Sequence, residues 1–149
     1  MALLTPIGSK FLIVAHDAVT PGTPVEVGEV VSISGPTPSV EALDTSSLTD
    51  TYATRIAGRT DWGTVSVTIN VTETTTSPAT QQYSDLAALG GTAVDWEITI
   101  PCADCASADP LKLSGTAAIC GQLGVNVTSG SVVQTTLELQ LSGDVTLDF

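Results

Sequence analysis

Hydrophobic and polar residues alternate along much of this chain with the period of two that is typical of β-strands. The clearest run is 63–72, in which Val65, Val67, Ile69 and Val71 alternate with serine, threonine and asparagine. The pattern predicts a mainly β protein. Further strands are expected at 10–15, 25–33, 93–100, 111–120, 132–142 and 145–149.

In two of these segments the pattern also predicts which side chains point toward the core. In 25–33 the apolar face also carries Glu29, and a bulge at Gly28 would correct the alternation. In 132–142 Val133, Leu137, Leu139 and Leu141 are expected to point inward, and Gln134, Thr136, Glu138, Gln140 and Ser142 outward.

One segment has the signals of a helix. Ser77 can cap a first turn, Pro78 suits the first helical position, and Gly90-Gly91 supplies a stop, so a helix is predicted over 78–89. Its apolar stripe should lie against the sheet. The stripe consists of Ala79, Tyr83, Leu86, Ala87 and Gly90.

The segment 34–62 has prolines, many serine and threonine residues and little periodicity, so it is predicted to be a long loop. Loops of that length are usually functional or disordered. Strands in this number with one helix predict a β-sandwich or barrel flanked by an α-helix. We expect one domain spanning 1–149, because a chain of this length can bury one core of ordinary size.

Composition narrows the function classes. No apolar run approaches the roughly 18 residues of a membrane-spanning helix, and no basic leader precedes an apolar core, so neither a membrane protein nor a secretory signal is expected. Sixteen acidic residues face four basic ones, for a net charge of −12, which excludes phosphate-driven binding of nucleic acid. The acidity could also serve solubility alone.

Few residues in the sequence suggest a metal site or a catalytic site. Cys102 and Cys105 form a C-x-x-C that could be joined on paper with Cys120 and His16 into a zinc site. Cys120 and His16 are isolated in the sequence and do not form the second close pair of ligands that a zinc site usually has, so no metal is predicted. Cys102 and Cys105 are expected to form a disulfide or to remain free thiols. His16 and Asp17 are interpreted as a turn pair, because no nucleophile motif accompanies them. No cofactor and no enzymatic activity are expected.

The order of features resembles the major tail-tube proteins of long, flexible-tailed bacteriophages. The pieces that carry this resemblance are an acidic residue and an Asp-Thr step in the long segment, a G-x-x-D-x-G before the alternating strand, and a final strand ending at Ser142-Gly143. The matching positions in and just after the long segment are Glu41, Asp44, Thr45, Leu48, Asp50, Gly58, Asp61 and Gly63.

The resemblance implies hexameric rings stacked into a tube, through which DNA passes without specific binding, with a tape-measure protein and tail-terminator or tail-tip proteins as partners. It places the protein in the virion tail, assembled in the host cytoplasm. The long segment would then contact a neighbouring subunit through Glu41, Asp44, Thr45, Asp50, Arg55, Arg59 and Asp61. The candidates for the tube lumen are Glu138, Gln140, Thr68, Asn70 and Glu26.

Two other classes stay open. A β-sandwich adhesin or virion-decorating module would share the acidic, threonine-rich composition, but it should expose aromatic or apolar residues at loop tips. A β-rich enzyme is the third possibility. Arg55 and Arg59, two of the four basic residues, stand just before the alternating strand and are interpreted as part of an assembly contact.

Overall fold

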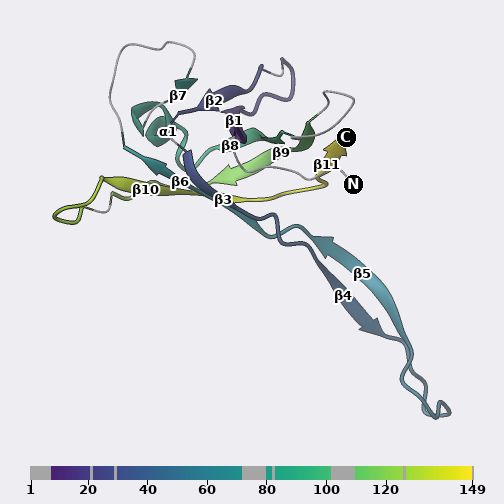
Figure 1. Ribbon diagram of the computed structural model, residues 1–149. Helices are drawn as coiled ribbons and strands as arrows, with labels where there is room; N and C mark the ends of the chain where they lie inside the picture. Colours follow the sequence, from purple (N-terminus) through teal and green to yellow (C-terminus); the bar gives the residue numbers. More distant parts are fainter. Residues whose placement is uncertain are drawn as a thin grey trace.

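The computed structural model describes residues 8–20, 22–28, 30–71, 80–81, 83–101, 110–125 and 127–148. These form a large β-sheet, a short helix and a two-stranded hairpin that projects from the body (Figure 1). The protein is mainly β with one helix, as the sequence predicts. The strands are β1 Lys10–Ala15, β2 Val25–Val27, β3 Val30–Ser34, β4 Ser39–Asp44, β5 Arg55–Asp61, β6 Thr64–Asn70, β7 Thr80–Gln81, β8 Ala93–Ile100, β9 Leu111–Cys120, β10 Gln134–Gln140 and β11 Thr146–Asp148; the helix is α1 Tyr83–Leu89.

The large sheet has the strand order β3-β6-β10-β9-β8-β1-β2-β7, with β11 beside β9. All its pairs are antiparallel except β2 with β7. The sheet curls on itself. A cavity shows this, since it is lined by side chains of β3, at one edge, together with side chains of β8 and β9. This curling places the inner faces of distant strands against each other, which is how a single sheet encloses a core.

The core consists of the inward positions of the alternating strands. In β6 and β10 every second residue is buried, which confirms the faces predicted for these strands. β8 alternates in the same way up to Ile98, and Phe11 and Ile13 are the buried residues of β1. Strand β10 is shorter than predicted and Thr135 joins its buried side. The largest fully buried side chains are Trp96, Phe11, Ile13, Ile69, Leu86, Leu137, Leu139, Val65, Val67, Val94 and Cys120.

The helix is shorter than predicted. It begins at Tyr83, and Thr80–Gln81 instead form β7, which pairs with β2. Ser77, Pro78 and Ala79 lie outside the described residues. Leu86 is fully buried as predicted, whereas Ala87 is exposed, so its predicted place in the stripe is wrong. Gly91 has φ +80°, a conformation that suits glycine and ends the helix at the predicted stop.

The predicted single strand 25–33 is wrong. β2 pairs with β1 and β3 pairs with β6, near opposite ends of the strand order, so the chain changes neighbours after Val27 instead of forming a bulge at Gly28. The inward phase also changes: Val31 is exposed, while Val30 and Ile33 pack against the core. Alternation alone could not reveal this change of partner.

The predicted loop 34–62 is also wrong in its secondary structure, because it contains the hairpin of β4 and β5. We call residues 39–61 the arm. All side chains of β4 and β5 are exposed, and only Gly58 is partly buried. A hairpin with no buried face needs no hydrophobic alternation, which is why the sequence pattern did not show it.

The arm continues the β3-β6 pair outward. β3 leads through Gly35 into β4, and β5 leads through Gly63 into β6 (Figure 1). Gly35 has φ +97° and Gly63 has φ +73°, in the region that side chains other than glycine rarely adopt. A Cβ at Gly35 would overlap the carbonyl oxygen of Thr64. These two glycines fix the direction in which the arm leaves the body.

Replacing Gly35 by alanine is therefore expected to destabilise the root of the arm by about 1–3 kcal/mol, the cost of a strained backbone conformation. Gly124→Ala is the matched control, because nothing lies within 4 Å of a Cβ at Gly124. Thermal unfolding of both variants checks this. Equal melting temperatures would show that the root adapts without strain.

Candidate assembly surfaces

The outward face of three neighbouring strands of the sheet, β3, β6 and β10, is almost entirely small and polar. It is formed by the outward residues of β3, β6 and β10, which the strand registers place side by side. Gln134 Nε2 donates a hydrogen bond to Asn70 Oδ1 across two of these strands, at 3.1 Å. Glu138 is its single charged residue. We call this surface the polar face: Ser32, Ser34, Thr64, Ser66, Thr68, Asn70, Gln134, Thr136, Glu138 and Gln140.

The structure brings four of the five lumen candidates together on the polar face. Thr68 and Asn70 lie opposite Thr136 and Gln134, and Glu138 and Gln140 follow on the same side of β10. Glu26 does not join them. It lies on β2, beside β1, and its carboxylate is 3.6 Å from Lys10 Nζ. The sequence could indicate outward positions but not which strands are neighbours.

All seven residues predicted to contact a neighbouring subunit lie on the arm. Glu41, Asp44, Arg55, Arg59 and Asp61 are on its strands; Thr45 and Asp50 are in the turn that joins them. Arg55 lies opposite Asp44 in the hairpin register. Within the described residues neither Arg55 nor Arg59 has an ion-pair partner. Both guanidinium groups are therefore available to another molecule.

The tip of the arm, residues 45–54, is ordered by short-range hydrogen bonds instead of by burial. Asp44 Oδ1 accepts from the backbone N–H of Ser46 at 2.8 Å, and Asp50 Oδ2 accepts from that of Ser47 at 2.6 Å. Ser46 Oγ accepts from the N–H of Thr54 at 2.8 Å. These bonds fix the turn while every side chain in it remains exposed.

The hydrogen bonds from Ser46, its hydroxyl first and then its backbone N–H, hold the pKa of Asp44 below its ordinary value of 3.8. Because the folded-state pKa is lowered, the ionised carboxylate supports the tip above pH 3.8. This support is lost as the pH falls through the lowered pKa.

The tip displays two large apolar side chains that the sequence analysis did not single out as anchors. Leu48 is fully exposed and Tyr52 is 83% exposed. Below them, Leu43 and Ile56 form an exposed cross-strand pair. Apolar side chains gathered on an arm that has no core beneath it are typical of a binding surface. Leu48, Tyr52 and Ile56 follow one another at intervals of four residues, a spacing typical of a helix face, so their spacing in sequence gave no signal of a hairpin tip.

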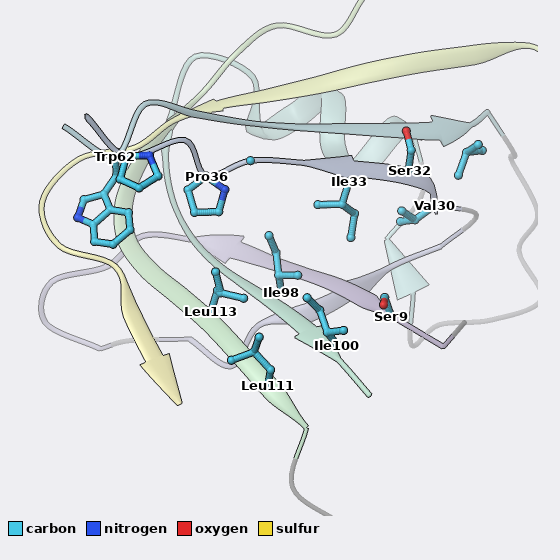
Figure 2. Close-up of a pocket in the computed structure, with 13 residues that line it drawn as sticks. Ser9, Val30, Ser32, Ile33, Pro36, Trp62, Ile98, Ile100, Leu111 and Leu113 are labelled. Atoms are coloured by element: carbon cyan, nitrogen blue, oxygen red, sulfur yellow. The ribbon is translucent and has the colours of Figure 1, made fainter. Parts of the chain in front are cut away.

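An apolar groove lies at the root of the arm. It has a volume of about 650 Å³ and lies between β3 and the β8-β9 pair. Figure 2 shows Trp62 and Pro36 at one end, the serines Ser9 and Ser32 at the other, and Ile33 above Ile98. Among the residues that the structure describes, no charged side chain lines it. The wall also includes Val30, Val31, Gly35, Pro38, Ile100, Leu111 and Leu113.

The candidate chemical residues have structural roles. Asp17 caps a turn by accepting from the N–H groups of Val19 and Thr20, as a turn residue should. His16 Nδ1 is 2.7 Å from Asp95 Oδ1, a partner the sequence did not suggest. Cys120 is buried and unpaired, and burial raises the pKa of its thiol.

The described residues contain no group of three potential metal ligands. Cys102 and Cys105 lie outside the described part of the chain, so the absence of a metal there stays a prediction. Among the described residues no helix is long and apolar enough to cross a membrane.

No family model matches the sequence, and no curated protein matches it. Solved structures do match in fold. One is a chain of an extracellular contractile injection system, in the PVC sheath/tube terminator in the extended state, with a TM-score of 0.64 and 13% identity over 97% of this chain and 96% of that one. Another is a chain of the anti-feeding prophage baseplate, 6-fold symmetrised, with a TM-score of 0.61 and 15% identity over 93% and 91%.

A third match is a chain from the tail of an empty gene transfer agent particle with C6 symmetry. Its TM-score is 0.56, with 11% identity over 93% of this chain and 96% of that one. Coverage is nearly complete in each case, so the whole chain, and not one motif, has this fold. The protein therefore has the fold of components of phage-tail-like particles.

Proposed function

We propose that this protein is a tail-tube subunit that forms hexameric rings, and that the rings stack into the tube of a long, flexible phage tail. The observation that carries the proposal is the combination of a curled β body with an exposed, internally ordered arm. The fold shared with chains of 6-fold particles supports it. An arm that buries nothing in its own subunit is best explained by a contact with another copy.

The dimensions of the arm suit such a contact. The eight residues from Thr54 to Asp61 span about 26 Å at about 3.3 Å per residue, and the tip extends beyond them. A body of about 120 residues has a radius of gyration of about 14 Å. The arm can therefore reach well across a neighbouring body.

The polar face is proposed to line the lumen. Its hydroxyl and amide groups are small, and its one charge, Glu138, would repeat around each ring as a circle of carboxylates. Such a surface repels the phosphates of DNA and offers them no cationic partner. DNA would pass during ejection without specific binding. Glu26, which lies beside Lys10 on another part of the sheet, is not included in this lumen surface.

The remaining partners follow from this role. We propose that a tape-measure protein occupies the lumen during assembly and that terminator and tip proteins cover the ends of the tube. The protein would assemble in the host cytoplasm and function in the virion. No enzymatic step is part of this proposal.

A free-standing adhesin or virion-decorating module is the second candidate, because the exposed Leu48 and Tyr52 at the arm tip are the kind of feature it requires. The oligomeric state of the purified protein distinguishes the two candidate functions. A decorating module is expected to remain monomeric as its concentration rises, whereas a tube subunit is expected to form large particles. Sedimentation velocity across a concentration series tests the proposed function.

Charge reversal on the arm tests its role in assembly. Arg55→Glu and Arg59→Glu are each expected to raise the protein concentration required for assembly about 5- to 30-fold at low salt, the effect of one or two kcal/mol. High salt should reduce the defect, because screening acts within a Debye length of about 8–10 Å. Sedimentation at two salt concentrations measures it.

Lys112→Glu changes the net charge equally and is the matched control, because Lys112 is exposed on β9 of the body. It is expected to assemble like the wild type. Equal defects in all three variants would show that total charge matters and that the arm arginines have no special contact.

A further inference from the structure

The motif G-x-x-D-x-G, residues 58–63, lies where the arm joins the body (Figure 1). Strand β5 ends at Asp61 and β6 begins at Thr64, so the last residues of the motif form the link between the arm and the sheet. The sequence analysis assigns Asp61 to a contact with a neighbouring subunit. Its hydrogen bonding in the structure indicates a different role.

The carboxylate of Asp61 is bonded to its own chain. Its Oδ1 accepts a hydrogen bond from the backbone N–H of Gly63 at 2.8 Å. The carbonyl oxygen of Gly63 in turn accepts from the N–H of Leu141, the buried residue that follows β10, at 3.0 Å. Both backbone polar groups of Gly63 are therefore used, one toward the arm and one toward the body, and together they link the direction of the arm to the end of β10.

The space around Gly63 admits no side chain. Its φ is +73°, and a Cβ there would lie 2.9 Å from the carbonyl oxygen and from Oγ1 of Thr37, in the link between β3 and β4. The preceding residue, Trp62, packs against the core. The link from arm to sheet is thus held by Thr37, by Leu141 and by the core, which leaves it few alternative conformations.

Gly58, the first residue of the motif, belongs to a β-bulge in the arm. The hairpin register shifts between Val40 and Ala42, so that Glu41 lies opposite two residues of β5, Gly58 and Arg59. A Cβ at Gly58 would lie 3.0 Å from the carbonyl oxygen of Glu41, tighter than an ordinary contact. Glycine therefore suits the crowded position of the bulge.

The bulge turns the two arginines of the arm to opposite faces. On a regular strand, Arg55 and Arg59 would share one face, because side chains alternate with a period of two. The extra residue shifts this alternation by one. Arg55 stays on the face of Asp44, its partner in the register, whereas Arg59 lies on the face of Asp61. The motif thus sets which way the arm faces as well as its direction.

We propose that Gly58, Asp61 and Gly63 form an elbow that fixes the direction and the facing of the arm in the free subunit, and that Asp61 is a positioning residue and not itself a contact with a neighbouring subunit. This inference rests on the proposed function, because the direction of the arm matters for assembly only if the arm joins one copy to the next. An arm that is fixed in advance loses less conformational freedom on binding. The same angle would recur at every joint between copies.

The distance between the arm and the body in the free subunit tests the elbow. The ketone-bearing residue p-acetylphenylalanine replaces Leu48 at the tip and Thr116 on β9, both exposed, and each carries a nitroxide. This labelling leaves the three cysteines untouched. Double electron–electron resonance on labelled chains diluted with unlabelled protein reports the distance within one chain. We expect one narrow distance distribution.

Two substitutions at Asp61 separate a positioning role from a contact role. Asp61→Ala removes the acceptor for the N–H of Gly63, whereas Asp61→Asn removes the charge and keeps an oxygen that can accept. We expect Asp61→Ala to broaden the distance distribution and, in the unlabelled chain, to raise the concentration required for assembly about three- to tenfold, the effect of one lost hydrogen bond. Asp61→Asn is expected to behave like the wild type in both measurements.

Asp17→Ala is the matched control, because it removes a similar turn hydrogen bond, to the N–H of Val19, on the body. It should leave the arm distance unchanged. Deletion of Gly58 removes the extra residue of the bulge and is expected to leave the body folded, by circular dichroism, but unable to assemble. This last result is expected because the part of the arm beyond the bulge then faces the other way.

Three results would overturn the inference: a broad distance distribution in the wild type, normal assembly without Gly58, or equal assembly defects in Asp61→Ala and Asp61→Asn with unchanged arm distances. In the last case the charge of Asp61 would itself be the contact. A wild type with a narrow distribution that stays monomeric at every concentration would overturn the proposed function and leave the geometry of the elbow standing.

Discussion

A variant in which Asn-Gly replaces residues 40–60 is expected to fold normally and to lose assembly completely. Ser39 and Asp61 are opposite each other in the hairpin register, so a two-residue turn can join them. Asp61 keeps its hydrogen bond to the N–H of Gly63, and Trp62 keeps its packing on the core. The body retains every residue of its hydrophobic core.

The expected melting temperature is within a few degrees of the wild type, because the removed strands have no buried side chains and a shorter loop changes closure entropy only slowly. Sedimentation velocity should show monomers at concentrations at which the wild type forms particles. Val19→Asp, an exposed change on the body, is the control and should assemble normally. Normal particles from the armless variant would remove the arm from the assembly mechanism.

Leu86→Asp is expected to destabilise the folded protein by about 3–5 kcal/mol, a large part of a typical stability of about 5–15 kcal/mol. Leu86 is fully buried and belongs to the core cluster, so the substitution removes an apolar side chain and buries a carboxylate without a partner. Urea denaturation followed by circular dichroism measures the change.

Ala87→Asp is the matched control, because it adds the same charge at the next position of the same helix, where the side chain is exposed. Its effect is expected to stay within about 0.5 kcal/mol. If both variants lost equal stability, the helix itself would be the sensitive element, and the packing of Leu86 would not explain the loss.

Strand boundaries could be predicted from the sequence where one face of the strand is buried. β1, β8 and β9 begin and end where the alternation or apolar run predicts, because one face of each packs against the core. The hairpin was missed for the opposite reason: with no buried face, β4 and β5 have no selection for alternation. The division of 25–33 was missed because Gly28 separates strands with different partners, which depends on the tertiary fold.

For the candidate surfaces, too, the sequence predicted outward positions but not which strands are neighbours. Alternation placed Thr68, Asn70, Glu138 and Gln140 on outward faces, and the structure unites them because β6 and β10 are neighbours. It separates Glu26 from them, since β2 lies far along the strand order. The exposed tip residues Leu48 and Tyr52 could be recognised only once their exposure and the hydrogen bonds of the turn were known.

Electron cryo-microscopy of the purified protein would show directly whether it forms a tube and which surface lines the channel. We expect 6-fold rings stacked into tubes, with the polar face around Glu138 turned toward the channel and each arm extended onto a neighbouring subunit. A protein that remains monomeric at every concentration, or a tube whose channel is lined by another surface, would contradict this expectation.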